Sequence, residues 1–411
     1  MKLSRLLIAT QLAPTGDSGV QSHFNAIFRY ALSEGINTSI LSPNRSGNIV
    51  LRKLGSLVTR LLIAVKREWG VLWFRRLDRE LLRMQLKKEL RKVDQKERVV
   101  IYAQDPGSAQ AALAVRATLL RVRVVMVVHY NISEAFEQTL TGNTTERGRL
   151  HAQLLRLERD VLPRVDALIF PSRFMRDQVR ERVPATVAVE SHVIPNFADA
   201  VSETGDGTLD GDIISIGTLE PRKNQGFLIR VLAEANRRGY RYTLSLVGRG
   251  PSLEELKALA RRLGVDAHVR FLGRVDGAIN LISRYRVYAH AALMENLPIT
   301  LLEAMSVRRP IIAPPVGGIP EIFTDGQEGL YWDLSNPQSA SKRLISLLED
   351  TELYTRLAKA GGERFESVFS PSVLEPIWLN AIMHIDPVGF ASNQPAQLQV
   401  GIDAGKQSWI H

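Results

Sequence analysis

The chain has 411 residues, of which 45% are hydrophobic and 23% are charged, a composition typical of a globular protein. This length exceeds what one ordinary hydrophobic core supports and favours two or three domains. No apolar run approaches the roughly 18 residues that a membrane-spanning helix needs, and the absence of cysteine excludes disulfide bonds and thiolate catalysis.

Positive charge is concentrated in the first quarter of the chain. The whole chain has a net charge of +10, and residues 1–100 alone contain 19 Lys or Arg and 8 Asp or Glu. In residues 66–92, basic residues alternate with tryptophan, phenylalanine and leucine at roughly helical spacing. Such a helix suits an anionic membrane surface, although an ordinary domain helix with a solvated basic face has the same pattern. No nucleic-acid-binding motif accompanies the charge, so no nucleic-acid partner is predicted.

Strand-like and helix-like segments alternate through the first half of the chain, which is the rhythm of a parallel sheet. The expected strands lie at residues 6–10, 37–43, 99–105, 124–130 and 167–172, and the clearest helices at 20–35 and 107–120. The N-terminal segment resembles a short signal peptide but lacks a small-residue cleavage site. We therefore interpret it as the first buried strand and expect a cytoplasmic location.

The same rhythm restarts after residues 197–211, which are polar, glycine-rich and acidic like a linker. Further strands are expected at residues 212–218, 242–248, 269–273, 287–293 and 310–314, and helices at 224–239, from 252, and at 337–348, 353–368 and 372–383. The prediction is an α/β fold with two Rossmann-like domains, residues 1–200 and 201–370. Residues 387–411 are expected to form a loosely ordered tail.

Residues 288–323 hold the densest group of candidate binding residues. Glu295 follows an expected strand, Pro298 suits the start of the next helix, and that helix carries Glu303. The following strand leads to Gly317-Gly318, whose backbone N–H groups can approach an anion closely. Ligands bind at the carboxyl ends of the strands in open parallel sheets, so these groups are predicted to form part of a binding site.

Two glycine loops and one histidine extend this predicted site. Gly19 opens the first helix, whose N-terminus can bind an anion, although a plain strand-to-helix turn has the same sequence. After the strand that ends at Gly217, Arg222 and Lys223 can neutralise a pyrophosphate, unless they are a solvated surface pair. His129 ends an apolar strand and can hydrogen-bond a sugar hydroxyl, with a core histidine as the alternative.

No metal site is predicted. Residues 210–212 read Asp-Gly-Asp, a pattern that can hold a divalent metal, but here it lies in the polar linker before a strand. We interpret it as part of a turn. The eight histidines show no spacing typical of metal ligands.

The motifs of the C-terminal half resemble those of retaining glycosyltransferase family 4, a nucleotide-sugar-dependent group with the GT-B fold. They are GTLEPRKN, HAALMENLPITLLEAM and PVGGIPEI, in this order. The N-terminal half resembles the family in its glycine loop, its strand-end histidine and its general layout. The resemblance implies two Rossmann-like domains facing a cleft. The N-terminal domain would bind the acceptor, and the last helix, residues 371–386, would return to it.

The resemblance also implies a role for each matching residue. Glu303 would accept hydrogen bonds from the nucleotide ribose, and Glu295 would orient the donor sugar or stabilise charge at its anomeric carbon. Arg222 and Lys223 would hold the diphosphate, and His129 would contact the donor sugar. Further donor contacts are implied for Gly19, Gly217, Val275, Asn296, Leu301 and Leu302.

Three departures from the family pattern affect the donor side. Thr218 stands where many members have an arginine, so Arg222 would supply that charge. Asn296 replaces a glycine, and the first loop has Gly19 where many members have two glycines. These changes leave the predicted fold intact but leave the donor sugar open.

The expected reaction is metal-independent transfer with retention, through an oxocarbenium-like state. The donor would be a nucleotide sugar, with UDP favoured over GDP, and the acceptor a glycan or lipid-linked hydroxyl of polysaccharide or lipopolysaccharide biosynthesis. The basic helix motivates a peripheral position on the inner face of the membrane. A sugar-nucleotide epimerase of the same fold and a non-catalytic membrane-binding scaffold remain the alternatives.

Overall fold

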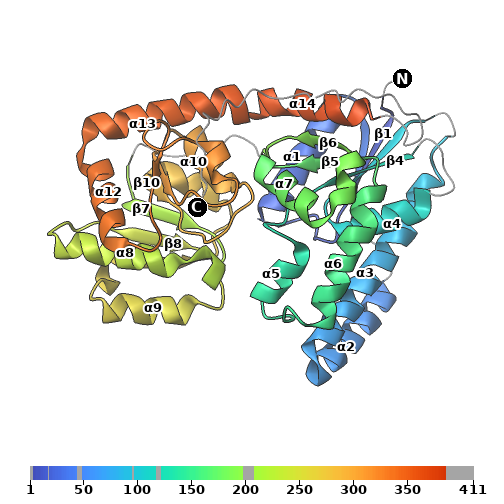
Figure 1. Cartoon of the computed structure of the whole chain (residues 1–411), viewed down its shortest axis with the longest axis horizontal. Coiled ribbons are helices and arrows are strands. Elements are labelled where there is room, and N and C mark those ends of the chain that lie inside the picture. Colours follow the sequence, from blue (N-terminus) through green and yellow to red (C-terminus); the bar gives the residue numbers. More distant parts are fainter. Residues whose placement is uncertain are drawn as a thin grey trace. The chain divides into compact units, whose positions relative to one another are not determined.

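The protein divides into two compact units in the computed structural model (Figure 1). Unit 1 comprises Met1–Pro195 and the chain from Glu375 onward, and unit 2 comprises Asn196–Leu374. The structure describes residues 3–16, 18–43, 49–94, 97–116, 122–197 and 208–385. Most of the predicted linker and the predicted C-terminal tail therefore lie outside the described residues.

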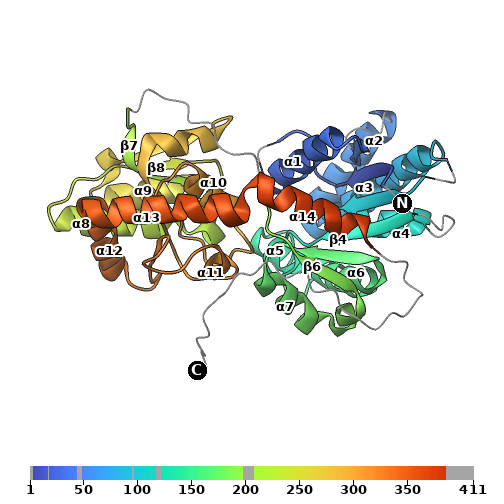
Figure 2. The ribbon, with the colours of Figure 1, turned by 90° about the horizontal axis from the view of Figure 1, so that it is seen from above.

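Unit 1 is built on a six-stranded parallel sheet in the order β2-β1-β3-β4-β5-β6. Its strands are β1 (Arg5–Ala9), β2 (Asn37–Leu41), β3 (Val99–Ala103), β4 (Val122–Val127), β5 (Ala167–Phe170) and β6 (Glu190–Val193). Every residue of β3 is buried, as expected where helices cover both faces of a parallel sheet. Figure 2 shows these helices around the strands.

The helices of unit 1 begin at polar capping residues at several places. Ser18 and Gln21 form a capping box at the start of the first helix, and Ser133 and Ser172 cap two others. The helices are α1 (Gly19–Ser33), α2 (Ile49–Val65), α3 (Arg67–Leu90), α4 (Pro106–Arg116), α5 (Glu134–Leu140), α6 (Arg149–Val161) and α7 (Arg173–Arg182).

The last helix, α14 (Pro371–Met383), contributes a large aromatic side chain to the core of unit 1. Trp378 is fully buried, and its ring packs edge-on against Tyr102 of β3, with 5.6 Å between ring centroids. A second edge-on contact joins Trp378 to Tyr30 of α1. Such aromatic pairs stabilise a core beyond the area that they bury.

Helices α2 and α3 form an antiparallel hairpin that turns at Lys66. Gly55 of α2 lies against Leu77 of α3, and Gly70 of α3 lies against Thr59 of α2. Helix α3 packs in turn on α4, α6 and β2, and its C-terminal half buries Leu81, Leu82, Leu86 and Leu90. The inner half of the basic segment is thus an ordinary domain helix, whereas its N-terminal half has exposed aromatic side chains.

Unit 2 repeats the architecture with the strand order β12-β11-β10-β7-β8-β9, also parallel. Its strands are β7 (Gly211–Ile216), β8 (Leu244–Val247), β9 (Val269–Gly273), β10 (Tyr285–Ala289), β11 (Ile311–Ala313) and β12 (Leu330–Tyr331). Its helices are α8 (Gln225–Arg237), α9 (Leu253–Arg262), α10 (Ile299–Ser306), α11 (Ile319–Ile322), α12 (Pro337–Glu349) and α13 (Thr351–Arg364). Buried aliphatic side chains fill both sides of the sheet.

The predicted α/β fold with two Rossmann-like sheets is confirmed, with local differences at element ends. The strand expected at 287–293 ends at Ala289, because the chain turns there into the loop that holds Glu295. Pro298 is the cap of α10 and not its first residue. The helix expected at 353–368 changes to a π-helical turn at Phe365–Phe369. Among the described residues, no helix is long and apolar enough to cross a membrane.

Candidate active site

The carboxyl ends of β7, β10 and β11 meet at one edge of the unit 2 sheet. Ile214 of β7 is paired with Tyr288 of β10, and Ala289 of β10 is paired with Ile312 of β11. Because parallel strands in register end at the same edge, the three loops that follow them come together. The backbone N–H of Leu293 donates to the carbonyl of Arg222 over 2.8 Å, which ties two of these loops directly.

Glu295 is the centre of a buried charge cluster in these loops. It is 6% exposed, and its Oε1 accepts from Lys223 Nζ and from Nε2 of His290, the latter over 3.1 Å. Its Oε2 lies 3.5 Å from a guanidinium nitrogen of Arg222. Arg222 also donates to Glu220 over 2.9 Å. Glu295, Arg222 and Lys223 were predicted to share a site, and the structure brings all three together.

The cluster keeps the Glu295 carboxylate ionised. Burial by itself would raise the pKa of Glu295, but Lys223, His290 and Arg222 outweigh it and hold that pKa well below its usual range. Burial also lowers the pKa of His290, against the opposing effect of Glu295. A neutral His290 therefore donates from Nε2 to the carboxylate, since a carboxylate only accepts.

Glu303 lies on α10 in an environment of the opposite kind. Its side chain is buried and lines a small void together with Phe197, Ile299, Leu302, Ser306, Phe365 and Phe369. Its Oε2 has no hydrogen-bond partner among the described residues. Burial without a compensating charge raises the pKa of Glu303 to about 8. Glu295 and Glu303, eight positions apart, thus have pKa values shifted in opposite directions.

Glycines let the loops after β7 and β8 approach each other closely. A Cβ on Gly248 would lie 2.0 Å from the carbonyl oxygen of Gly217, and one on Gly250 would lie 2.1 Å from that of Leu219. Gly217 also lies near Lys223, since a Cβ on it would be 3.8 Å from Lys223 Cε. These close backbone contacts explain why glycines occupy the turn after β8.

Gly317 and Gly318 lie against the loop that holds Glu295. Gly317 adopts a left-handed backbone with φ of 59°, and a Cβ there would lie 1.8 Å from the carbonyl oxygen of Glu295. The N–H of Gly318 donates to that same carbonyl over 3.1 Å. The prediction that this pair offers its N–H groups to an anion is therefore wrong for Gly318, whose N–H holds the Glu295 loop.

The remaining predicted donor residues of unit 2 are largely structural in their observed positions. Leu301 and Leu302 are buried in the core beside Tyr288, and Asn296 is buried next to Glu295. Val275 is half-buried after β9. Their predicted donor contacts remain predictions.

The carboxyl edge of the unit 1 sheet carries the predicted His129. Its Nε2 lies 2.9 Å from Oε1 of Gln104, and its ring meets that of His23 edge-on. Burial, reinforced by His23, lowers the pKa of His129 well below its ordinary value. His129 is therefore a neutral histidine whose Nε2–H donates to Gln104, and its Nδ1 has no partner among the described residues.

Gly19 is the first residue of α1, directly after the capping residue Ser18. The side chain of Gln21 donates to the carbonyls of Ala13 and Thr15, which fixes the loop before this helix. Asp17, in the same loop, lies outside the described residues. The predicted helix N-terminus is present in the structure, and its contact with a donor remains a prediction.

An ion pair at the same edge of unit 1 was not predicted. Arg75, from the helical hairpin, donates to Glu134 at the start of α5, and both side chains are largely buried. Glu158 of α6 also accepts from the backbone N–H of Glu134 over 3.0 Å and from Arg182 over 3.0 Å. The α2–α3 hairpin is thus connected to the loop that follows His129.

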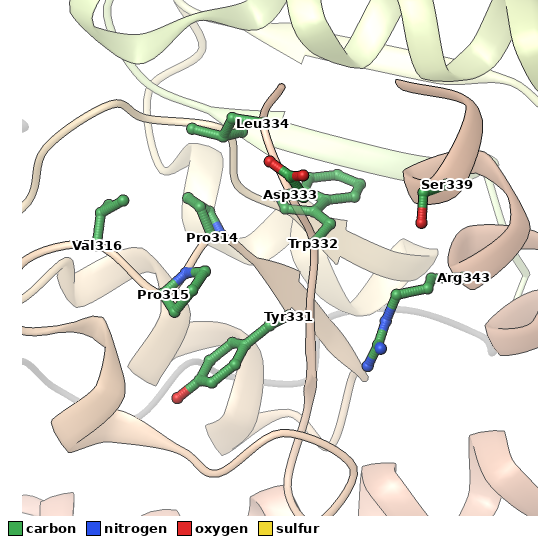
Figure 3. Close-up of a pocket in the computed structure, with 9 residues that line it drawn as sticks. All are labelled: Pro314, Pro315, Val316, Tyr331, Trp332, Asp333, Leu334, Ser339 and Arg343. Carbon is green, nitrogen blue, oxygen red and sulfur yellow. The ribbon is translucent and has the colours of Figure 1, made fainter. Parts of the chain in front are cut away.

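A separate cavity of about 500 Å³ opens beside the loop after β11. Figure 3 shows Pro314, Pro315 and Val316 along one side, Ser339 and Arg343 of α12 on the other, and residues 331–334 between them. Trp332 in its wall donates its indole N–H to the carbonyl of His290 over 2.9 Å. Pro315 and Val316 of the motif PVGGIPEI line this cavity, but none of the residues with a predicted role does, and its wall supports the Glu295 cluster through His290.

The Asp-Gly-Asp pattern is structural, but it does not form the turn that was predicted. Asp212 lies within β7, where its side chain accepts from the backbone N–H of Thr243 over 2.9 Å and pairs with Arg286. Asp210 pairs with Arg284. No group of three His, Asp or Glu side chains in the described part of the chain is arranged to hold a metal ion.

Two family models match the chain. Residues 18–201 match the model described as Glycosyltransferase Family 4, and residues 204–364 match the one described as Glycosyl transferases group 1. Two solved structures of low sequence identity share the fold. One is Anabaena HepE in complex with UDP and glucose, with a TM-score of 0.68 and 17% sequence identity, covering 93% of this chain and 99% of that chain. The other is sucrose-phosphate synthase from Thermosynechococcus elongatus, with a TM-score of 0.72 and 16% sequence identity, covering 93% of this chain and 98% of that chain.

Curated relatives are glycosyltransferases with several substrates. A GDP-mannose-dependent alpha-(1-6)-phosphatidylinositol monomannoside mannosyltransferase of Mycolicibacterium smegmatis is 30% identical over 217 residues, 48% of this chain and 56% of that protein. The lipopolysaccharide core biosynthesis glycosyltransferase LpsE of Rhizobium meliloti is 28% identical over 170 residues, 41% of this chain and 49% of that protein. The chain spans about half the length of these relatives.

The two parallel six-stranded sheets and their structural neighbours place the protein in the class that has the GT-B fold. Within that class, the chain belongs to glycosyltransferase family 4, as its motifs implied.

His290 was not among the predicted site residues, although its position in the sequence carries a usable signal. His290 directly follows the apolar strand β10, as His129 follows the apolar end of β4. The strand-end position that selected His129 would have selected His290 as well. Arg75 had no comparable signal, because nothing in the basic hairpin distinguishes it from the neighbouring Arg76 and Arg79.

Proposed function

We propose that this protein transfers a hexosyl group from a nucleotide sugar to a hydroxyl of a glycan or lipid-linked acceptor, with retention and without a metal ion. The observation that carries the proposal is the ionised, buried Glu295 held by Lys223, Arg222 and His290 at the carboxyl edge of the sheet. A fixed anion beside two cations suits a reaction in which positive charge develops on a sugar while a diphosphate leaves.

Each charged group has a defined part in this reaction. Lys223 and Arg222 are partly exposed and bind the diphosphate, while Glu295 stabilises the anomeric carbon as it becomes oxocarbenium-like. The bond from the anomeric carbon to the phosphate oxygen breaks as the bond to the acceptor oxygen forms on the same face. The departing phosphate takes the acceptor proton.

Glu303 binds the nucleotide ribose in this proposal. Its unpartnered carboxyl oxygen is suited to hydroxyl donors, which would supply the hydrogen bonds that the apolar surroundings do not. Val275, Asn296, Leu301, Leu302 and Gly217 support the donor. Gly19 and His129 of unit 1 contact the diphosphate and the sugar.

The donor is proposed to be a UDP-sugar, with GDP-mannose as the alternative. HepE was solved with UDP and glucose, and the mycobacterial relative is GDP-mannose-dependent. The acceptor is proposed to be an intermediate of polysaccharide or lipopolysaccharide assembly, on the inner face of the membrane, which residues 66–92 would contact. LpsE is named for lipopolysaccharide core biosynthesis.

None of the relatives reported above is an epimerase, so sugar transfer is favoured over epimerisation.

The deciding experiment incubates the protein with UDP-glucose, UDP-N-acetylglucosamine, UDP-galactose and GDP-mannose, with and without a mixed lipid-linked oligosaccharide acceptor, and identifies products by mass. Transfer predicts free nucleoside diphosphate and an acceptor heavier by one sugar. An altered nucleotide sugar without an acceptor product would establish an epimerase instead. A scaffold would show no nucleotide-dependent thermal stabilisation.

A further inference from the structure

The α2–α3 hairpin has an unusual share of the exposed apolar surface. Sixteen large apolar side chains are exposed among the described residues, and nine of them lie on this hairpin. Helix α2 packs mainly on α3 and forms the outer layer of unit 1 there, as Figures 1 and 2 show. A soluble surface rarely concentrates apolar side chains in this way without a partner.

Four of the five exposed apolar residues of α2 lie on one face of the helix, and the fifth, Ile63, lies on the side next to Gly70 of α3. Leu54, Leu57, Leu61 and Val65 are spaced by three, four and four residues, which aligns them in a stripe. Leu61 and Val65 are 62% and 73% exposed. The opposite face of α2 packs on α3 at Gly55 and Thr59. The stripe is therefore directed away from the protein.

Charge on the hairpin is separated in a way that favours an anionic partner. Exposed cations border the stripe and occupy the bend, where Lys66 and Arg67 lie. The acidic residues Glu68 and Asp78 are buried, and Glu68 accepts from the backbone N–H of Leu150 over 2.5 Å and from Thr144 over 2.9 Å. Glu68 also lies 3.4 Å from Lys66 and offsets part of its charge, whereas the exposed Arg60 and Arg67 keep the outer surface near the bend basic.

Trp69 and Trp73 continue the apolar surface past the bend on α3, and both are exposed. Indole rings prefer the boundary between lipid headgroups and acyl chains. We propose that the bend end of the hairpin docks on an anionic lipid bilayer. Leu61, Val65 and the two tryptophans enter the headgroup boundary, and Lys66 and Arg67 contact lipid phosphates. Nucleic acid fits less well, because it has no counterpart for an aliphatic stripe.

This docking surface is connected to the part of unit 1 that is proposed to bind the acceptor. The link between docking and the acceptor rests on the proposed function. Arg75 lies two residues after Trp73 on α3 and pairs with Glu134, whose helix begins five residues after His129. The same rigid helix therefore spans from the docking surface to the sheet edge that carries His129. Docking would hold this edge at a fixed height above the lipid, where a lipid-linked acceptor presents its sugar.

The test is co-sedimentation of the full chain with vesicles of phosphatidylcholine alone or mixed with phosphatidylglycerol, at low and high salt. We expect preferential binding to the anionic vesicles that weakens with salt, together with a blue shift of tryptophan fluorescence. Two double variants should each lower the partition coefficient about tenfold or more. One combines Leu61→Gln with Val65→Gln, and the other combines Lys66→Glu with Arg67→Glu. Trp69→Phe with Trp73→Phe should abolish the blue shift.

The matched control is Leu140→Gln with Val187→Gln, two exposed apolar side chains elsewhere on unit 1, which should bind vesicles like the unaltered protein. Failure of the unaltered protein to bind anionic vesicles at low salt would overturn the proposal. So would equal binding by the Leu61 and Val65 variant, or binding to duplex RNA without binding to vesicles. Vesicle binding needs no sugar donor, so these failures would leave transfer to a soluble acceptor intact. If the unaltered protein bound vesicles but bound no nucleotide, the proposed function would be refuted instead.

Discussion

His290 donates from Nε2 to Oε1 of Glu295 over 3.1 Å, and both side chains are buried. His290 is itself fixed, because its backbone N–H donates to Ile312 and its carbonyl accepts from Trp332. His290 therefore fixes the position of the Glu295 carboxylate, which lies in a loop, relative to the sheet. We regard it as a positioning residue for Glu295.

Replacing His290 by phenylalanine should lower kcat while leaving the KM for the donor nearly unchanged. The ring still fills the space, but the hydrogen bond to a charged group, worth about 1.5–3 kcal/mol, is lost. The expected loss is roughly 10- to 100-fold in kcat. His290→Gln, which can still donate, should recover most of the rate. Near-normal kcat for His290→Phe would mean that the residue only fills space, and equal losses in both variants would contradict a role through the hydrogen bond.

Replacing Glu295 by glutamine should abolish transfer while nucleotide binding persists. The change removes the charge that opposes the developing oxocarbenium ion, and a loss of at least about 100-fold in kcat is expected. Binding of UDP, followed by thermal shift, should be equal or tighter, because Lys223 and Arg222 lose an intramolecular competitor. Glu220→Gln is the matched control, since Glu220 also pairs with Arg222 at 2.9 Å. Near-normal turnover of Glu295→Gln would refute the assigned role.

The fold and the centre of the site could be predicted because they depend on local patterns. Apolar strands alternate with amphipathic helices, and parallel strands bring the residues after them to one edge of the sheet. Glu295, Arg222 and Lys223 all follow such strands, so their meeting followed from topology, although Lys223 and Glu295 are 72 residues apart.

Contacts that depend on side-chain reach could not be predicted in the same way. Arg75 pairs with Glu134, 59 residues away, and no local pattern distinguishes it from the other arginines of α3. Gly318 was expected to face an anion, but its N–H donates to Glu295. A glycine pair permits close backbone approach, and its sequence does not specify whether a ligand or another loop approaches.

Replacing Gly317 by alanine should be strongly destabilising. Its φ is 59°, and a Cβ would lie 1.8 Å from the carbonyl oxygen of Glu295, so both backbone strain and a clash with the backbone result. Gly264→Ala is a matched control, because Gly264 has a φ of 68° with no atom within 4 Å of the added Cβ. We expect a loss of about 1 kcal/mol for Gly264→Ala and a much larger loss for Gly317→Ala in urea unfolding. Similar losses of unfolding free energy in the two variants would show that Gly317 does not approach the Glu295 carbonyl closely.

The affinity for a nucleotide sugar should rise with pH through Glu303. If the ionised carboxylate accepts from the ribose, binding favours the deprotonated form, and the pKa of about 8 leaves this form scarce at pH 6. The association constant for UDP-glucose or GDP-mannose should therefore increase about tenfold per pH unit below this pKa and level off above it. A diphosphate diester loses no phosphate proton in this range. Calorimetry of Glu303→Gln should show weaker binding without this slope.

Glu303 should also make the free protein less stable as the pH rises. Its folded pKa of about 8 exceeds its ordinary value of 4.5, so its stabilising effect is complete below the unfolded pKa and is lost between the two values. Glutamine resembles the neutral carboxyl and removes this loss. Glu303→Gln should match the unaltered protein within about 2 °C at pH 5 and raise Tm by roughly 5 °C or more at pH 8.5. Glu352→Gln, an exposed carboxyl of α13, should change Tm little at either pH. A Tm difference for Glu303→Gln that does not grow with pH would show that the carboxyl is not desolvated in solution.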